Sequence, residues 1–232
     1  MISLLLLGFL LGMRHTLEAD HLAAVASITT QSFSTKQAVK QGAVWGLGHT
    51  ITLFLCGSLV LLFDQVVPLT FAMFLEFAVG LMLCGLGIDV LHRLHKKRVH
   101  FHVHHHADLG QHFHAHSHSN KEHHIESAHQ HQHSDGFPRR TLMIGFIHGI
   151  AGSAALIVLT LQSVDSYLTG LLYIALFGVG SILGMAALSA VVAIPLRHSA
   201  KGLTRLHNAL QLSIGCITIF IGAALAVENY PL

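Results

Sequence analysis

The sequence contains few charged residues. Asp, Glu, Lys and Arg make up 10% of its 232 residues, whereas about a quarter of a typical soluble domain is charged. Apolar residues account for 52%, which excludes a soluble enzyme with a charged surface and also a disordered chain. The formal net charge of +2 is too small to indicate nucleic-acid binding. We therefore expect a membrane protein whose main partner is the lipid bilayer.

Cysteine is also scarce, and the motifs of several enzyme classes are missing. Cys56, Cys84 and Cys216 all lie in apolar runs and form no CxxC pair, so neither a disulfide framework nor a thiolate metal site is indicated. No Walker A phosphate loop is present, so we expect no ATP hydrolysis by this chain. Nothing indicates a substrate cleft or a bound cofactor, and we expect a protein that is not an enzyme.

Long apolar runs dominate the rest of the chain. A helix needs about 20 largely apolar residues to cross the hydrocarbon core of a bilayer. The sequence predicts an all-α integral membrane protein with six transmembrane helices, separated by short connections except at 93–139. The expected spans are residues 2–28, 38–63, 69–92, 140–162, 167–195 and 205–228.

Basic residues gather in three of the five connections. Lys and Arg concentrate in the cytoplasmic loops of membrane proteins. With six spans, these three connections share one side of the membrane. We therefore expect a multi-pass protein of the cytoplasmic (plasma) membrane, with both termini outside and the connection 93–139 in the cytoplasm. The basic residues concerned are Lys36, Lys40, Arg93, Lys96, Lys97, Arg98, Lys121, Arg139, Arg140, Arg197, Lys201 and Arg205.

Short glycine motifs recur in the two halves of the chain. Gly8-Phe9-x-x-Gly12 resembles Gly145-Phe146-x-x-Gly149, and Trp45-Gly46-Leu47-Gly48 resembles Phe177-Gly178-Val179-Gly180. Two three-helix repeats of inverted topology, as in many transporters, would explain this recurrence. Alternatively, the motifs are alike because small residues let membrane helices approach closely. We expect a first repeat at 1–92, a histidine-rich cytoplasmic loop at 93–139 and a second repeat at 140–232.

The first span contains several ionisable side chains. His15, Glu18, Asp20 and His21 fall within seven residues, and such groups are costly in hydrocarbon unless they pair or mark an ion path. One interpretation is an ion pair between Arg14 and Glu18, which are four residues apart, with the others as packing residues. The other is a divalent-cation site, because imidazole and carboxylate suit nickel, cobalt, zinc or iron.

Further histidines fall at a similar membrane depth. His49 lies about a dozen residues beyond Lys36–Lys40, and His148 lies about 12 Å from Arg140 at the rise of an α-helix. On one regular helix, Asp20 and His21 would point about 140° and 240° away from His15. They converge only if this helix breaks or if the ligands divide between neighbouring cavities, and broken helices are where transporters place ion sites.

The long connection is rich in histidine. Residues 100–133 include 14 histidines, many spaced as His-x-His, and few large apolar side chains. We expect a disordered cytoplasmic loop that binds metal loosely, with copper above nickel and cobalt in affinity. Its role in collecting, buffering or sensing metal stays open, as does a purely linking role. Candidate loop ligands are His102, His104, His106, His114, His116 and His118.

The segment from Arg14 to His21 resembles the His-x4-Asp-His signature of the nickel/cobalt transporter family. Gly48-His49-Thr50 is similar to that family's Gly-His-Ser/Thr motif in the next helix. With six spans, the chain most resembles the urease-accessory-type (UreH-like) nickel permeases. The resemblance implies that His15, Asp20, His21 and His49 are metal ligands or their close partners. Glu18 and His148 are weaker candidates. The second half lacks the further carboxylate motif of longer members, which leaves its ligands open, with His148 as a candidate.

These observations predict a secondary transporter that moves Ni²⁺ or Co²⁺ across the membrane. Ala19 before Asp20 favours import, because related efflux proteins have a Pro-Gly-His variant of the motif. Cytoplasmic metal chaperones are candidate partners. Two alternatives stay open at this point. One is an efflux permease of the same fold, and the other is a membrane metal sensor or chaperone that works through the histidine-rich loop.

Overall fold

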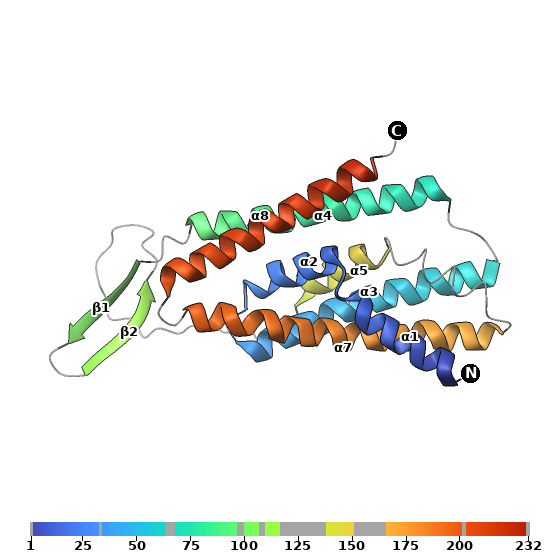
Figure 1. Cartoon of the computed structure of the whole chain (residues 1–232), viewed down its shortest axis with the longest axis horizontal. Coiled ribbons are helices and arrows are strands. Elements are labelled where there is room, and N and C mark those ends of the chain that lie inside the picture. The colour runs from blue at the N-terminus through green and yellow to red at the C-terminus, as the bar shows by residue number, and fades with distance from the viewer. Residues whose placement is uncertain are drawn as a thin grey trace.

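The protein is a helical membrane protein. A computed structural model describes residues 2–32, 34–63, 68–96, 100–106, 110–116, 138–150, 166–200 and 203–230. Four of its helices are long and apolar enough to cross a membrane, namely α3 (Thr35–Phe63), α4 (Leu69–Lys96), α7 (Tyr167–Ala200) and α8 (Thr204–Glu228). Within the described residues there are three shorter helices as well, namely α1 (Ile2–His15), α2 (Ala19–Thr29) and α5 (Arg139–Ile150) (Figure 1).

The long helices coincide with four of the six expected spans. Each of the second, third, fifth and sixth spans is one continuous helix. The first span is instead divided between α1 and α2, which are separated by three residues. The start of the fourth span is α5, and residues 151–162 lie outside the described residues.

The histidine-rich connection differs from the expectation. Strand β1 (His100–His106) pairs antiparallel with β2 (Gly110–His116), so that His102 lies opposite His114 in the register. The helical fold predicted for the membrane part is confirmed, whereas the prediction of a disordered loop does not hold for these two segments. The physical reason is a period of two in the sequence, which suits an extended strand.

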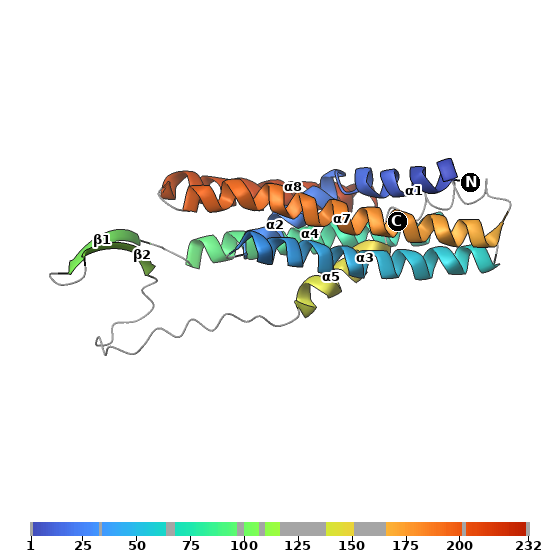
Figure 2. The ribbon, with the colours of Figure 1, turned by 90° about the horizontal axis from the view of Figure 1, so that it is seen from below.

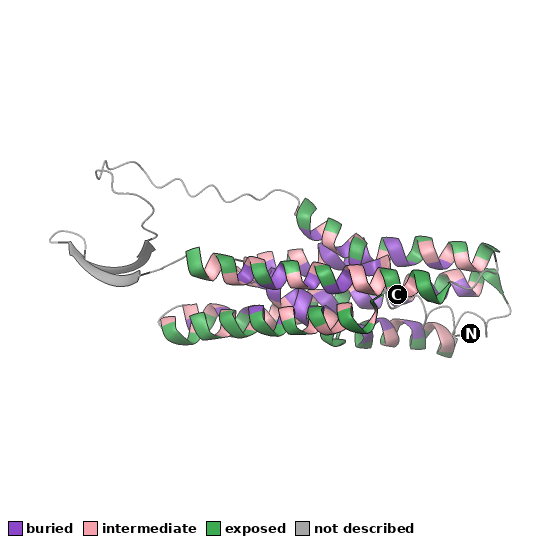
Figure 3. Cartoon of the chain, turned by 90° about the horizontal axis from the view of Figure 1, so that it is seen from above, coloured by how far each residue is buried: buried purple, intermediate pink, exposed green. Residues whose placement is uncertain are grey.

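The helices pack in pairs along the bundle. Helix α3 lies along α7 and α4 lies along α8, while α1 packs on α7 and α5 packs on α3. Figures 1 and 2 show that α1, α4 and α7 run toward the hairpin, whereas α3, α5 and α8 run away from it. Buried residues concentrate where the helices face one another, and exposed residues cover the outer surfaces (Figure 3).

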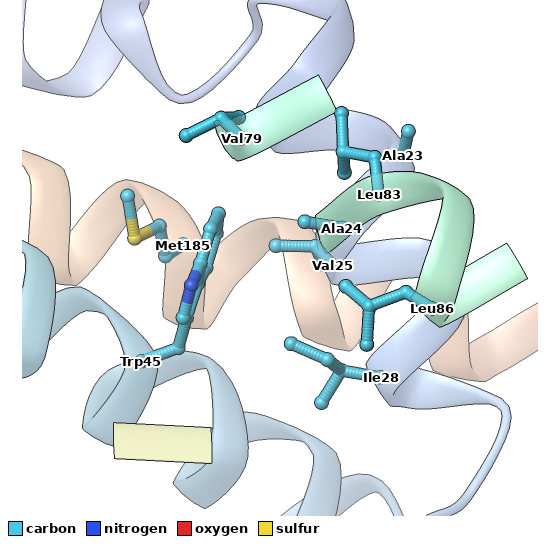
Figure 4. Close-up of a cluster of buried hydrophobic side chains, with 9 residues drawn as sticks. All are labelled: Ala23, Ala24, Val25, Ile28, Trp45, Val79, Leu83, Leu86 and Met185. Carbon is cyan, nitrogen blue, oxygen red and sulfur yellow. The ribbon is translucent and has the colours of Figure 1, made fainter. Parts of the chain in front are cut away.

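Helix α2 lies in the middle of this bundle. Its apolar residues Ala23, Ala24, Val25 and Ile28 are buried against side chains of α3, α4 and α7 (Figure 4). Trp45, Val79, Leu83, Leu86 and Met185 complete this cluster of buried side chains. The packing holds the first turn of α2, which contains Asp20 and His21, inside the protein.

Candidate metal centre

The first expected span breaks directly after His15. The amides of Leu17 and Glu18 donate to the carbonyls of Arg14 and His15, as in a tight turn. Glu18 then adopts an extended backbone with ψ of 147°, and α2 begins at Ala19. The Thr16 hydroxyl donates to the Met13 carbonyl at 2.7 Å. The break lets His15 and His21 lie on the same side, which a continuous helix would prevent.

Three histidines meet at this break. The ring centroids of His15 and His21 are 4.2 Å apart. The ring of His49, from the middle of α3, lies 5.4 Å from His15 and 5.1 Å from His21. Each of the three offers a nitrogen within 4.8 Å of the others, and all three side chains are buried. These atoms are close enough together for one ion to contact all three.

A second group of donors shares His21 with the first. His148 Nε2, from α5, lies 2.9 Å from Asp20 Oδ2 and 3.3 Å from His21 Nδ1. His21 Nδ1 also lies 3.1 Å from Asp20 Oδ1. Asp20, His21 and His148 therefore form another set of three metal-ligand atoms within 4.8 Å of one another. Helices α1, α2, α3 and α5 together supply four imidazoles and one carboxylate.

Most of these imidazole nitrogens lack a hydrogen-bond partner in the described part of the chain. They include both nitrogens of His49, Nε2 of His15 and His21, and Nδ1 of His148, all fully buried. A buried polar atom without a partner costs about 1–3 kcal/mol. Several such atoms that face one place are the donors that a borderline divalent cation prefers. The arrangement suits cation binding better than packing.

A curated relative resembles this chain over nearly its whole length. The chain is 36% identical to the urease accessory protein UreH of Bacillus sp. (strain TB-90) over 223 residues, which cover 96% of this chain and 90% of the relative. The chain belongs to the UreH family. The family resemblance drawn from the motifs is thereby confirmed.

A more distant relative is a plant protein. The UreH-family chain is 23% identical to the chloroplast protein FOR GROWTH AND FERTILITY 1 of Arabidopsis thaliana over 230 residues, and it spans 58% of that relative's length. No family model matches the chain, and no solved structure matches it.

The two weaker candidates, His148 and Glu18, lie in different parts of the site. His148 is buried and contacts both Asp20 and His21. Glu18 is about half exposed, at 48%, and lies 2.9 Å from His15 Nδ1. Among the described residues, Glu18 forms its ion pair with His15 and not with Arg14. Glu18 therefore touches the edge of the cluster, whereas His148 belongs to its centre.

One residue at the centre was missed by the sequence analysis. Trp45 is completely buried, and its ring lies 5.2 Å from the His148 ring and 5.5 Å from the His21 ring. Its indole nitrogen has no hydrogen-bond partner in the described residues. The available signal was its position one helical turn before His49. Trp45 therefore packs beside both rings at the centre of the cluster.

The loop histidines are a separate group. His102, His104 and His106 belong to β1, and His114 and His116 belong to β2. His118 lies outside the described residues. Their metal binding stays a prediction from the sequence.

Proposed function

We propose that this protein is a secondary transporter that moves Ni²⁺ or Co²⁺ across the cytoplasmic membrane, in the direction of uptake. The observation that supports this most is the group of buried, unpartnered imidazoles beside Asp20 in the interior of a membrane protein. Nitrogen and oxygen donors without thiolate suit nickel and cobalt. The family resemblance to nickel permeases points to the same cargo.

In the proposed cycle, the chain's own ligands replace the hydration shell of the ion. His15, His21 and His49 supply neutral nitrogens, and Asp20 supplies the negative charge that lowers the cost of a dication in a low-dielectric interior. Trp45 and the apolar part of α2 exclude water around the ligands. Release then follows when the cluster opens to the other side of the membrane.

We further propose six spans arranged as two inverted three-helix repeats. The proposal rests on reciprocal close contacts between the halves. A β-carbon on Gly12 would meet the Phe177 carbonyl oxygen at 2.0 Å, and one on Gly145 would meet the Trp45 carbonyl oxygen at 2.2 Å. Phe177 and Trp45 are equivalent by the motif match, so Gly12 and Gly145 are equivalent too. This pairing also makes His15 the counterpart of His148.

The same reciprocity extends to the third helix of each half. A β-carbon on Gly80 would lie 2.6 Å from the Gly222 carbonyl oxygen, and one on Gly87 would lie 2.7 Å from the Gly215 carbonyl oxygen. If Gly80 is the counterpart of Gly215 and Gly87 is the counterpart of Gly222, the contact between Gly80 and Gly222 corresponds to the contact between Gly215 and Gly87. The two contacts are therefore related by the proposed repeat. The opposite directions of α1 and α5, of α3 and α7, and of α4 and α8 support inversion (Figure 1). In this arrangement both termini are outside and the histidine-rich connection is cytoplasmic.

The test is accumulation of radioactive nickel in cells that express the protein. Expression should raise nickel uptake, and His21→Ala should return it to background. The exposed His92 provides a matched control, since His92→Ala removes an imidazole at the far end of α4. Reduced accumulation in expressing cells would instead indicate efflux. Unchanged uptake in the His21→Ala variant would contradict the proposed site.

A further inference from the structure

We propose that the metal centre offers the ion two alternative positions that share His21, and that only one of them joins the two halves of the protein. This inference rests on the proposed transport function and adds a sequence of steps to it. We call His15, His21 and His49 the first set, and Asp20, His21 and His148 the second set. Each set brings its three ligand atoms within 4.8 Å of one another.

The first set lies entirely in the first half of the chain. Its members come from α1, α2 and α3. His49 is completely buried, and both of its nitrogens lack a partner among the described residues. Such a side chain in a membrane interior is costly unless it receives a ligand. The first set is therefore complete without any residue from 140–232.

The second set spans the two halves. Asp20 and His21 belong to α2, whereas His148 belongs to α5 of the second half. His148 reaches both of them at hydrogen-bond distance through the same nitrogen, Nε2. An ion held by these residues would tie α5 to α2. Movement of one half against the other would change this set and leave the first unchanged.

His21 can serve only one set at a time. Its Nδ1 lies against Asp20 and His148, and its Nε2 is buried without a partner in the described residues. A neutral imidazole has a single lone pair, because its other nitrogen bears a proton. We assign Nδ1 to the second set and Nε2 to the first. Transfer of the ion exchanges the two neutral tautomers, so Nδ1 loses one proton, Nε2 gains one, and the charge of the ring is unchanged.

Two positions with one common ligand explain how the ion could be passed on without returning to water. The ion would leave His15 and His49 while it gains Asp20 and His148, and His21 would stay beside it throughout. Alternating access in transporters with repeats is largely motion of one half against the other. The second position would couple the ion to that motion because it contains ligands from both halves.

The experiment uses the full-length protein in lipid nanodiscs and the emission of its single tryptophan. Trp45 lies 5.2 to 6.4 Å from the rings of His21, His49 and His148, so paramagnetic Ni²⁺ bound there should quench it. Titration with NiCl₂ should give saturable quenching for the wild type, for His49→Ala and for His148→Ala. Each single variant retains one intact set and should bind more weakly, by about tenfold or more. His21→Ala should show no saturable quenching.

Transport measurements separate binding of the ion from its passage through the protein. In proteoliposomes, His49→Ala and His148→Ala should both lose at least nine-tenths of nickel uptake, although each still binds the ion. Nickel should slow hydrogen exchange in α5 (Arg139–Ile150) for His49→Ala and should leave it unchanged for His148→Ala. His92→Ala should behave as the wild type in all three measurements.

The outcomes distinguish this inference from the proposed function. If the wild type transports nickel but His49→Ala and His148→Ala both abolish quenching, the protein has one undivided site. That result would overturn the proposal of two positions. Uptake above half of wild type in either variant would also overturn them. Absence of both quenching and uptake in the wild type would overturn the transport function itself. The variants His49→Gln and His148→Gln, which keep a polar side chain of similar size, repeat the test if the alanine variants fail to fold.

Discussion

His148 Nε2 lies 2.9 Å from Asp20 Oδ2, although the two residues are 128 positions apart in the chain. This contact brings the first half and the second half of the sequence together at the place where buried imidazoles gather. His21 contacts both of them, with Nδ1 at 3.1 Å from Asp20 Oδ1 and 3.3 Å from His148 Nε2. The candidate metal centre therefore lies where the two halves of the sequence meet.

Asp20→Asn tests the contribution of the carboxylate charge. The amide keeps the size of the side chain but removes the negative charge that balances a dication. We expect nickel uptake to fall by at least tenfold while the protein still folds, and size-exclusion profiles in detergent would check the folding. Uptake close to that of the wild type would show that Asp20 is only a hydrogen-bonding residue.

Glu18→Gln is the matched comparison for Asp20→Asn. Glu18 is half exposed and contacts only the edge of the cluster through His15. Because exposed ion pairs contribute about 0–1 kcal/mol, we expect uptake to decrease by less than about fivefold. Initial uptake rates at several nickel concentrations would measure this. Equal losses in the two variants would place Glu18 among the ligands.

Gly145→Ala tests the close packing of α5 on α3. The added β-carbon would lie 2.2 Å from the Trp45 carbonyl oxygen, which is backbone and cannot move aside cheaply. Overpacking of this kind costs about 1–3 kcal/mol, so the thermal unfolding temperature should fall. Gly85→Ala is the control, because a β-carbon there meets no described atom within 4 Å, and its unfolding temperature should not fall. Equal stability of both variants would contradict the packing.

Deletion of residues 100–133 separates transport from metal sensing. If the helices perform transport, nickel uptake should persist at half of the wild-type level or more at saturating metal, because the cluster lies among the helices. A measurement of uptake against nickel concentration would reveal any contribution of the loop at low metal. Complete loss of uptake in a well-expressed deletion variant would favour the sensor or chaperone alternative.

Much of the fold could be predicted because it follows from hydropathy. The apolar runs that contain His49 and Asp89 are long enough to span a bilayer, and each is one helix in the structure. The sequence predicts the break after His15 only in a conditional form. Asp20 and His21 cannot join His15 on a regular helix, so a shared site requires the helix to break. The turn itself depends on local hydrogen bonds of Thr16, Leu17 and Glu18, which hydropathy does not encode.

Other parts depend on tertiary contacts that the sequence does not reveal. The motif match pairs Gly8 with Gly145, whereas the repeat proposed from the packing contacts pairs Gly12 with Gly145, one helical turn further along. The environment of Trp45 follows from α5 and α2, which are distant in the sequence. His148 could be named as a candidate from its depth, but its contact with Asp20 requires the fold.

The most direct test of the central claim is nickel uptake by purified protein in proteoliposomes, compared between the wild type and His21→Ala, with and without a pH gradient. The account predicts time-dependent, saturable Ni²⁺ accumulation by the wild type and none above empty liposomes for His21→Ala, at equal amounts of reconstituted protein. Equal accumulation by the two proteins would contradict the account, because His21 is the ligand that both donor sets share.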